Sequence, residues 1–149
     1  MTTGSTLVAF KKALVAALQS RPELDGVRVT YEFTQDYVAD KAIWLEGARS
    51  ADRIPTMKPG TKRVEENYTL TLVIQVLASE GESQEAADEY ALVLLSEVQQ
   101  CLAENPQLIP EIMWATVDGW EHRIGQLPKG DGHGSGFNVR INVRARLYP

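Results

Sequence analysis

No catalytic motif appears in this sequence. His122 is a candidate general base, but that role needs an orienting partner and a nearby nucleophile. The sequence shows no nucleophile elbow, no HExxH and no second cluster of His or Cys. The single cysteine, Cys101, falls on the apolar stripe of a predicted helix, which is typical of a buried structural thiol. We therefore expect no catalytic residue, and we interpret His122 as structural or exposed.

A glycine-rich run at residues 129–136 has the composition of a phosphate-binding loop. Such loops lie between a strand and a following helix, whose N-terminus holds the phosphate. Here a strand pattern follows, and neither GxxxxGK[ST] nor GxGxxG is matched. Asp131 and His133 are too few ligands for a metal site. We predict a flexible loop over residues 126–136, with no metal and no cofactor.

The charge of the chain is unevenly distributed. Residues 64–110 hold nine Asp and Glu and no Lys or Arg, whereas residues 1–63 hold ten basic and seven acidic side chains. A block without basic residues suggests one acidic surface. That surface is either a solubilising face or one that repels passing DNA or docks a basic partner.

Arginines alternate along the last apolar segment, at Arg140, Arg144 and Arg146. Proteins that read nucleic acid combine such charges with stacking aromatics or a recognition helix, and this face has neither. We expect the arginines to pair with acids of their own fold or of a neighbouring subunit. The candidate interface acids are Glu65 in the longest strand and Glu85, Glu89 and Glu97 on the second long helix.

The composition of residues 47–63 predicts a long basic loop rich in Gly and Pro. Loops of this length are either functional or disordered. We interpret this one as an arm that orders on a partner, with a solvated insertion as the alternative. Its interface candidates are Arg49, Arg53, Lys58, Lys62 and Arg63.

Apolar periodicity places the structural elements. Residues 64–78 alternate with period two, which predicts a long strand with its even positions in a core and its polar odd positions, from Glu65 to Thr71, on the other face. Similar signals predict strands at 27–33, 41–46 and 136–148. Residues 111–125 are a strand pair or one bent strand, with a turn or bulge at Asp118-Gly119. Helices are predicted over 6–20, capped by Ser5, and over 84–104, capped by Ser83.

These elements predict a single α+β domain spanning residues 1–149, with a mixed, mainly antiparallel sheet and two main helices packed on it. The longest apolar runs are too short to span a membrane. We expect no signal peptide, because the N-terminus lacks a basic region followed by an apolar block. One cysteine allows no internal disulfide.

The order of elements resembles that of the tail-terminator (tail-completion) proteins of long-tailed phages. The likeness is one of pattern and length over almost the whole chain, and no single motif carries it. The segments that carry it are the first helix ending near Leu18, residues 24–29, Ile43-Trp44-Leu45 with Gly47, the strand from Tyr68 to Val76, the helix from Ala86 to Leu102, and residues 139–145.

The resemblance implies a non-enzymatic virion protein, assembled in the host cytoplasm and located where tail and neck meet. Members of this family form a six-membered ring that caps the tail tube, stops its polymerisation and presents the surface that joins the head. The implied partners are further copies of the chain, the tail tube protein and the head–tail connector or neck proteins. DNA passes through the lumen without specific binding, and no membrane is involved.

Two alternatives remain open from the sequence. The first is another neck component, such as a head-completion or head–tail connector protein. The second is a small enzyme or ligand-binding α+β domain that uses His122 or the glycine-rich loop.

Overall fold

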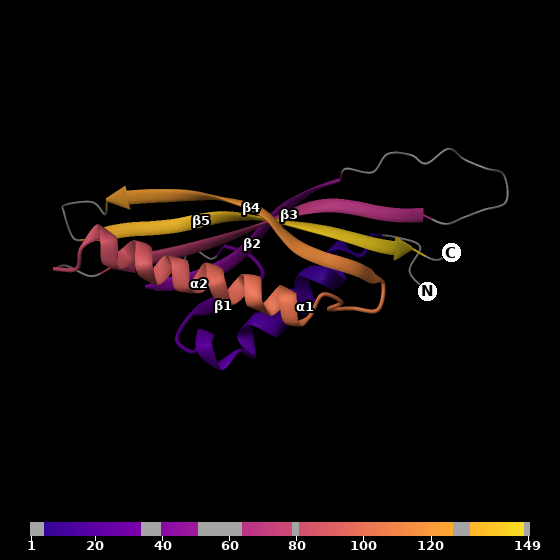
Figure 1. Cartoon of the computed structure of the whole chain (residues 1–149), viewed down its shortest axis with the longest axis horizontal. Coiled ribbons are helices and arrows are strands. Elements are labelled where there is room, and N and C mark those ends of the chain that lie inside the picture. The colour runs from indigo at the N-terminus through magenta and orange to yellow at the C-terminus, as the bar shows by residue number, and fades with distance from the viewer. Residues whose placement is uncertain (1–4, 34–39, 51–63, 79–80, 127–131, 148–149) are drawn as a thin grey trace.

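The computed structural model describes residues 5–33, 40–50, 64–78, 81–126 and 132–147. One five-stranded sheet in the order β1-β2-β3-β5-β4 carries two helices (Figure 1). β1 runs parallel to β2, and every other neighbouring pair is antiparallel. This confirms the predicted α+β fold with a mixed, mainly antiparallel sheet. The elements are α1 (Leu7–Gln19), the 3-10 turn η1 (Pro22–Leu24), β1 (Arg28–Thr30), β2 (Lys41–Ser50), β3 (Val64–Ala78), α2 (Gln84–Glu104), β4 (Ile112–Gln126) and β5 (His133–Leu147).

Both helices cover the same face of the sheet, and no helix of the described residues covers the other face (Figure 1). The even positions of β3 from Tyr68 to Ala78 are buried beneath the helices, as their alternation predicted. The odd positions from Asn67 to Leu77 are half-buried on the opposite, helix-free face. The helix-covered face therefore holds the hydrophobic core. Its fully buried side chains include Phe10, Leu14 and Leu18 of α1, Leu95 of α2 and Ile141 of β5.

The two helices begin close to where their capping residues predicted. The Ser83 hydroxyl accepts a hydrogen bond from the Ala86 backbone N–H at 3.1 Å, which satisfies one of the free N–H groups at the start of α2. α1 begins at Leu7, and its N-cap is Thr6, whose side chain makes no capping hydrogen bond, so Ser5 was predicted one residue too early. The Ser5 hydroxyl accepts a hydrogen bond from the Leu7 N–H at 3.1 Å. α2 ends at Glu104, and the Asn105 side chain donates to the Cys101 carbonyl oxygen at 3.1 Å.

Two predicted loops were partly wrong. β2 continues through Ser50, because Glu46 and Gly47 occupy one register position between Leu45 and Ala48, and pairing with β3 then resumes. Residues 51–63 of the predicted basic loop lie outside the described part of the chain. β5 begins at His133, so part of the glycine-rich run is strand. Gly136 allows close approach, since a Cβ there would collide with the Ile74 carbonyl oxygen.

The remaining strands settle the alternatives left open by the sequence. β4 is one long strand with register shifts at Ile112/Trp114 and Val117/Gly119, so Asp118-Gly119 lies at a bulge. Gly119 has a φ of 144°, which L side chains rarely adopt. β1 is shorter than predicted, because it pairs with β2 only over Arg28–Thr30.

Candidate assembly surfaces

The helix-free face of the sheet carries the predicted arginine row. Arg140 and Arg144 are exposed there, on the side of β5 opposite its buried positions. Arg144 pairs with Glu65 of β3, with 3.2 Å between Nη2 and Oε2. The Arg140 guanidinium lies over Gly119, where a Cβ would come within 2.7 Å of its Nη2. The structure thus pairs Glu65 with Arg144 within one chain, which is one of the two predicted kinds of pairing.

Arg146 and Arg49 lie at other positions of this face. Arg146 is half-buried, and its Cα is paired in register with Glu65. Arg49 is exposed on β2, opposite Thr69 of β3, so the structure places it in a strand where a loop was predicted. The other interface candidates of the basic segment, Arg53, Lys58, Lys62 and Arg63, lie outside the described residues.

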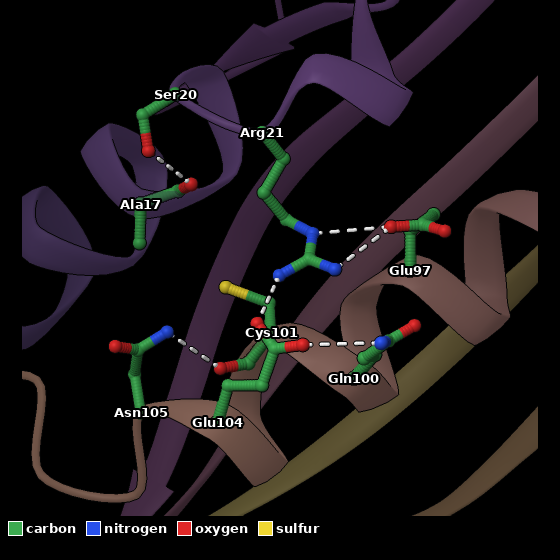
Figure 2. Close-up of polar contacts among 8 residues, drawn as sticks. All are labelled: Ala17, Ser20, Arg21, Glu97, Gln100, Cys101, Glu104 and Asn105. Carbon is green, nitrogen blue, oxygen red and sulfur yellow. Dashed lines mark hydrogen bonds and ion pairs between the residues drawn. The ribbon is translucent and has the colours of Figure 1, made fainter.

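Glu97 of α2 is held by an arginine that the sequence did not single out. Arg21 follows α1 and reaches between two carboxylates of α2 (Figure 2). Its Nη2 lies 3.0 Å from Glu97 Oε2, and its Nη1 lies 2.9 Å from Glu104 Oε2. Only 11% of the Arg21 side chain is exposed. The cluster ties the end of α1 to the C-terminal half of α2.

The charges of this cluster perturb one another. The hydrogen bond to Glu104 is the main reason that the pKa of Arg21 is raised. The same bond holds the pKa of Glu104 below its usual range. Burial raises the pKa of the neighbouring Cys101 thiol, which is fully buried and therefore neutral, as predicted for a structural cysteine.

Glu85 and Glu89 lie on the outer side of α2 and are exposed. They do not share a surface with every acid of residues 64–110, as the charge count had suggested. Glu65 lies across the sheet on the helix-free face, and Glu66 is buried, because β3 alternates its side chains between the two faces. Five of the eight acids that the structure describes in that block therefore lie on α2, namely Glu85, Asp88, Glu89, Glu97 and Glu104.

His122 belongs to a polar cluster with Asp88 and Ser135. Its Nε2 lies 3.2 Å from Asp88 Oδ1 and 3.0 Å from the Ser135 hydroxyl, which donates to the same Asp88 oxygen at 2.6 Å. A nucleophilic triad needs the carboxylate on one ring nitrogen of the histidine and the hydroxyl on the other. Here both lie at Nε2. The geometry ties α2 to the β4–β5 pair, with the pKa of Asp88 lowered chiefly by the Ser135 hydrogen bond.

A second buried polar cluster fixes the start of α1. The Glu66 carboxylate accepts hydrogen bonds from the backbone N–H and the hydroxyl of Thr6, at 2.9 and 2.7 Å. The Thr6 hydroxyl lies 3.1 Å from the Tyr68 hydroxyl. Burial raises the pKa of Tyr68 to about 12. This cluster holds the N-terminal end of α1 against β3.

A hollow of about 390 Å³ on the helix-free face is lined by Trp44, Gln75, Arg123 and Asn138 among others. Arg123 is the one ionisable group among the residues that line it, so it offers no acid–base pair. Among the described residues, no group of three or more His, Cys, Asp or Glu could hold a metal ion. No helix of those residues is long and apolar enough to cross a membrane.

Sequence reasoning missed the tertiary partners rather than the residue types. Arg21 and Glu97 are 76 positions apart, and Ser135 and Asp88 are 47 apart, so no local spacing links them. A signal was available for Glu66, a charge on the side of β3 that was predicted to face the core. Such a position requires a buried partner.

Comparison with solved structures shows that the fold is shared with a virion protein. A chain described as the virion of a native gene transfer agent particle superposes with a TM-score of 0.63 at 17% identity, over 95% of this chain and 100% of that chain. A second solved chain matches with a TM-score of 0.39 at 19% identity over 99% of both chains, too low a score to support any argument. No family model and no curated protein matches the sequence.

Proposed function

We propose that this chain is a structural component of a phage-like virion and acts by assembling with copies of itself and with other virion proteins. The supporting observation is the shared fold with a gene transfer agent virion protein over the full length of that chain. A structural match at 17% identity shows a shared fold and no more, so the proposed function rests also on the sequence pattern and on the surfaces of the molecule. Among the described residues, the polar clusters hold elements together and form no arrangement suited to catalysis.

Among the structural proteins of such virions, we propose that this chain is a tail terminator. The order and length of the elements follow the tail-terminator pattern from α1 to β5. In this role six copies would form a ring on the tail tube, stop its growth and present the surface that joins the head. The partners would be the tube protein and the neck proteins, with DNA passing through the ring.

Deletion of the gene in a strain that produces the particle tests the role. Electron microscopy should then show filled heads without tails beside tails of abnormal, variable length, because nothing stops tube growth. Complementation from a plasmid should restore normal particles. Heads lacking tails beside tails of normal length would instead indicate a head-completion or connector protein. Normal particles in normal numbers would contradict any structural role in the virion.

A further inference from the structure

Among the described strands, the sheet has two stretches of edge backbone without a neighbouring strand. Within the described residues, β4 pairs with β5 alone, and its register is unbroken from Gly119 to Gln126. At the other edge, β1 covers β2 only at Ala42–Trp44, so residues 45–49 pair with β3 alone among the described strands. A straight, uncovered edge is a template for pairing with another chain.

Exposed apolar side chains lie beside both edges. On β4, Trp120 and Ile124 are 50% and 66% exposed. Their register partners, Val139 and Ser135, are buried on the helix-covered face, so both side chains point to that side at the rim of the helix layer. At the opposite edge, Val8 of α1 is 53% exposed. It lies near the far end of β2, because Thr6 contacts Tyr68, which pairs with Ser50.

The helix-free side of each edge carries one acid and one base. On β2 these are Glu46, which accepts a hydrogen bond from Trp44 Nε1 at 3.0 Å, and Arg49, one alternate position further on. On β4 they are Glu121 and Arg123, opposite Asn138 and Gly136 of β5. All four are exposed. Each edge thus carries one acidic and one basic side chain on this side, and the acid comes first along the strand.

We propose that copies of this chain associate head to tail by adding the β4 edge of one copy, antiparallel, to residues 45–49 of β2 in the next copy. Arg49 then lies opposite Glu121 of the adjoining copy, and Glu46 lies beside its Arg123, with the bulge at Glu46-Gly47 taking up the extra residue. Facing side chains of opposite charge on adjacent strands attract at such spacings. This inference rests on the proposed function, because it names the contact through which the copies assemble.

Orientation supports the pairing independently of charge. β4 already runs antiparallel to β2 within one copy, so an added copy in the same orientation presents an antiparallel edge. Every copy then keeps its helices on the same side of a continuous sheet, and Trp120 comes toward Val8. In a flipped copy, β4 would instead run parallel to β2 of its neighbour, and the charged side chains of the two strands would lie on opposite faces of the sheet. Successive identical contacts of this heterologous kind close into a ring when the rotation per copy allows it.

Charge selects the register of the added strand. Sliding it by two residues toward the end of β2 would bring Arg49 opposite Arg123, and sliding it by two toward the start would bring Glu46 opposite Glu121; like charges directly opposite each other destabilise a sheet. In the proposed register Ile124 lies opposite Leu45, and Gly125 falls opposite Trp44, where Thr30 of β1 already lies. The added strand therefore pairs over Glu121–Ile124, and residues 125–126 bend away from β1.

Charge reversal followed by charge exchange tests the contact in the full chain. Arg49→Glu and Glu121→Arg should each weaken self-association by at least about tenfold, since each places like charges face to face. The double variant Arg49→Glu/Glu121→Arg should return to within about twofold of the wild type, because attraction is restored with reversed polarity. Glu89→Arg, on the outer side of α2, is the matched control and should associate normally. Sedimentation measures association, and circular dichroism with thermal unfolding verifies the fold.

Disulfide trapping provides the second readout. Glu46→Cys/Arg123→Cys should give cross-linked oligomers under mild oxidation, whereas Glu46→Cys/Glu89→Cys should not; Cys101 is fully buried and does not compete. The edge contact is overturned if the wild type stays monomeric and no cross-linked species form. It is equally overturned if Arg49→Glu associates normally, or if the exchange fails to restore association. None of these results alters the gene-deletion phenotype, so the virion role is decided separately.

Discussion

The two faces of the sheet differ in what they contribute to the molecule. The helix-covered face is apolar and closed, with Leu70, Leu72 and Ile141 fully buried. Most side chains of the helix-free face, Thr, Asn and Arg among them, are half-buried or exposed. Stability should therefore depend on the covered face, whereas the open face and the two edges should contribute little to folding and be available to other chains.

The largest expected difference between the faces comes from two neighbouring positions of β3. Leu72→Ala should lower the free energy of unfolding by about 2–5 kcal/mol, because a fully buried side chain leaves a cavity. Thr71→Ala on the open face should change it by less than about 0.5 kcal/mol. Chemical denaturation of both variants measures the difference. Equal losses would mean that the open face is as much a part of the folding core as the covered one.

A smaller effect is expected where charges join the two helices of the covered face. Arg21→Met should cost about 1–3 kcal/mol, because it keeps much of the side-chain volume but leaves Glu97 without its partner in a largely buried site. Its matched control is Arg144→Met, which removes the exposed pair with Glu65 on the open face and should cost less than about 1 kcal/mol. Equal losses of unfolding free energy in the two variants would contradict the claim that stability depends mainly on the helix-covered face.

The smallest effect concerns pH at the rim of the covered face. Hydrogen bonding from Ser135 lowers the pKa of Asp88 in the folded protein. A carboxyl with a depressed folded pKa stabilises the protein above its unfolded pKa of about 4, and this contribution is lost as pH falls through the folded value. Asp88→Asn should therefore lower the free energy of unfolding at pH 7 by up to about 1 kcal/mol. The expected loss is this small because the Asp88 side chain is 39% exposed to solvent. At pH 3 the loss should be smaller still.

Unfolding curves of wild type and Asp88→Asn between pH 7 and pH 3 measure this trend. Glu89→Gln, at the next and exposed position of α2, serves as the control. A difference between wild type and Asp88→Asn that grows on acidification would show that Asp88 does not stabilise the fold through its charged form.

The sequence predicted the covered face better than the open one. Alternation in β3 and β5 and the apolar stripes of α1 and α2 identify the core, because burial imposes a local period on each element. The continuation of β2 to Ser50 was missed, since a bulge at Glu46-Gly47 interrupts its period. The start of β5 at residues 133–135 was missed, because glycines that permit close approach to β3 look the same in sequence as those of a loop.

The candidate surfaces required the structure for a different reason. Arg49 and Glu121 are remote in sequence, and their relation appears only when strand order places β2 and β4 at opposite edges of one sheet. The local patterns of Glu46 to Arg49 and of Glu121 to Arg123 contain no information on which strand has a free edge. Topology supplies that information, because it is set by contacts distant along the chain.

An electron cryomicroscopy map of the assembled protein, alone or in the particle, would show the contact between copies itself. We expect β4 of each copy to lie beside residues 45–49 of β2 in the next, in a continuous sheet with all helices on one side. A ring whose copies meet through α2 or across the open face, with both sheet edges uncovered, would contradict it.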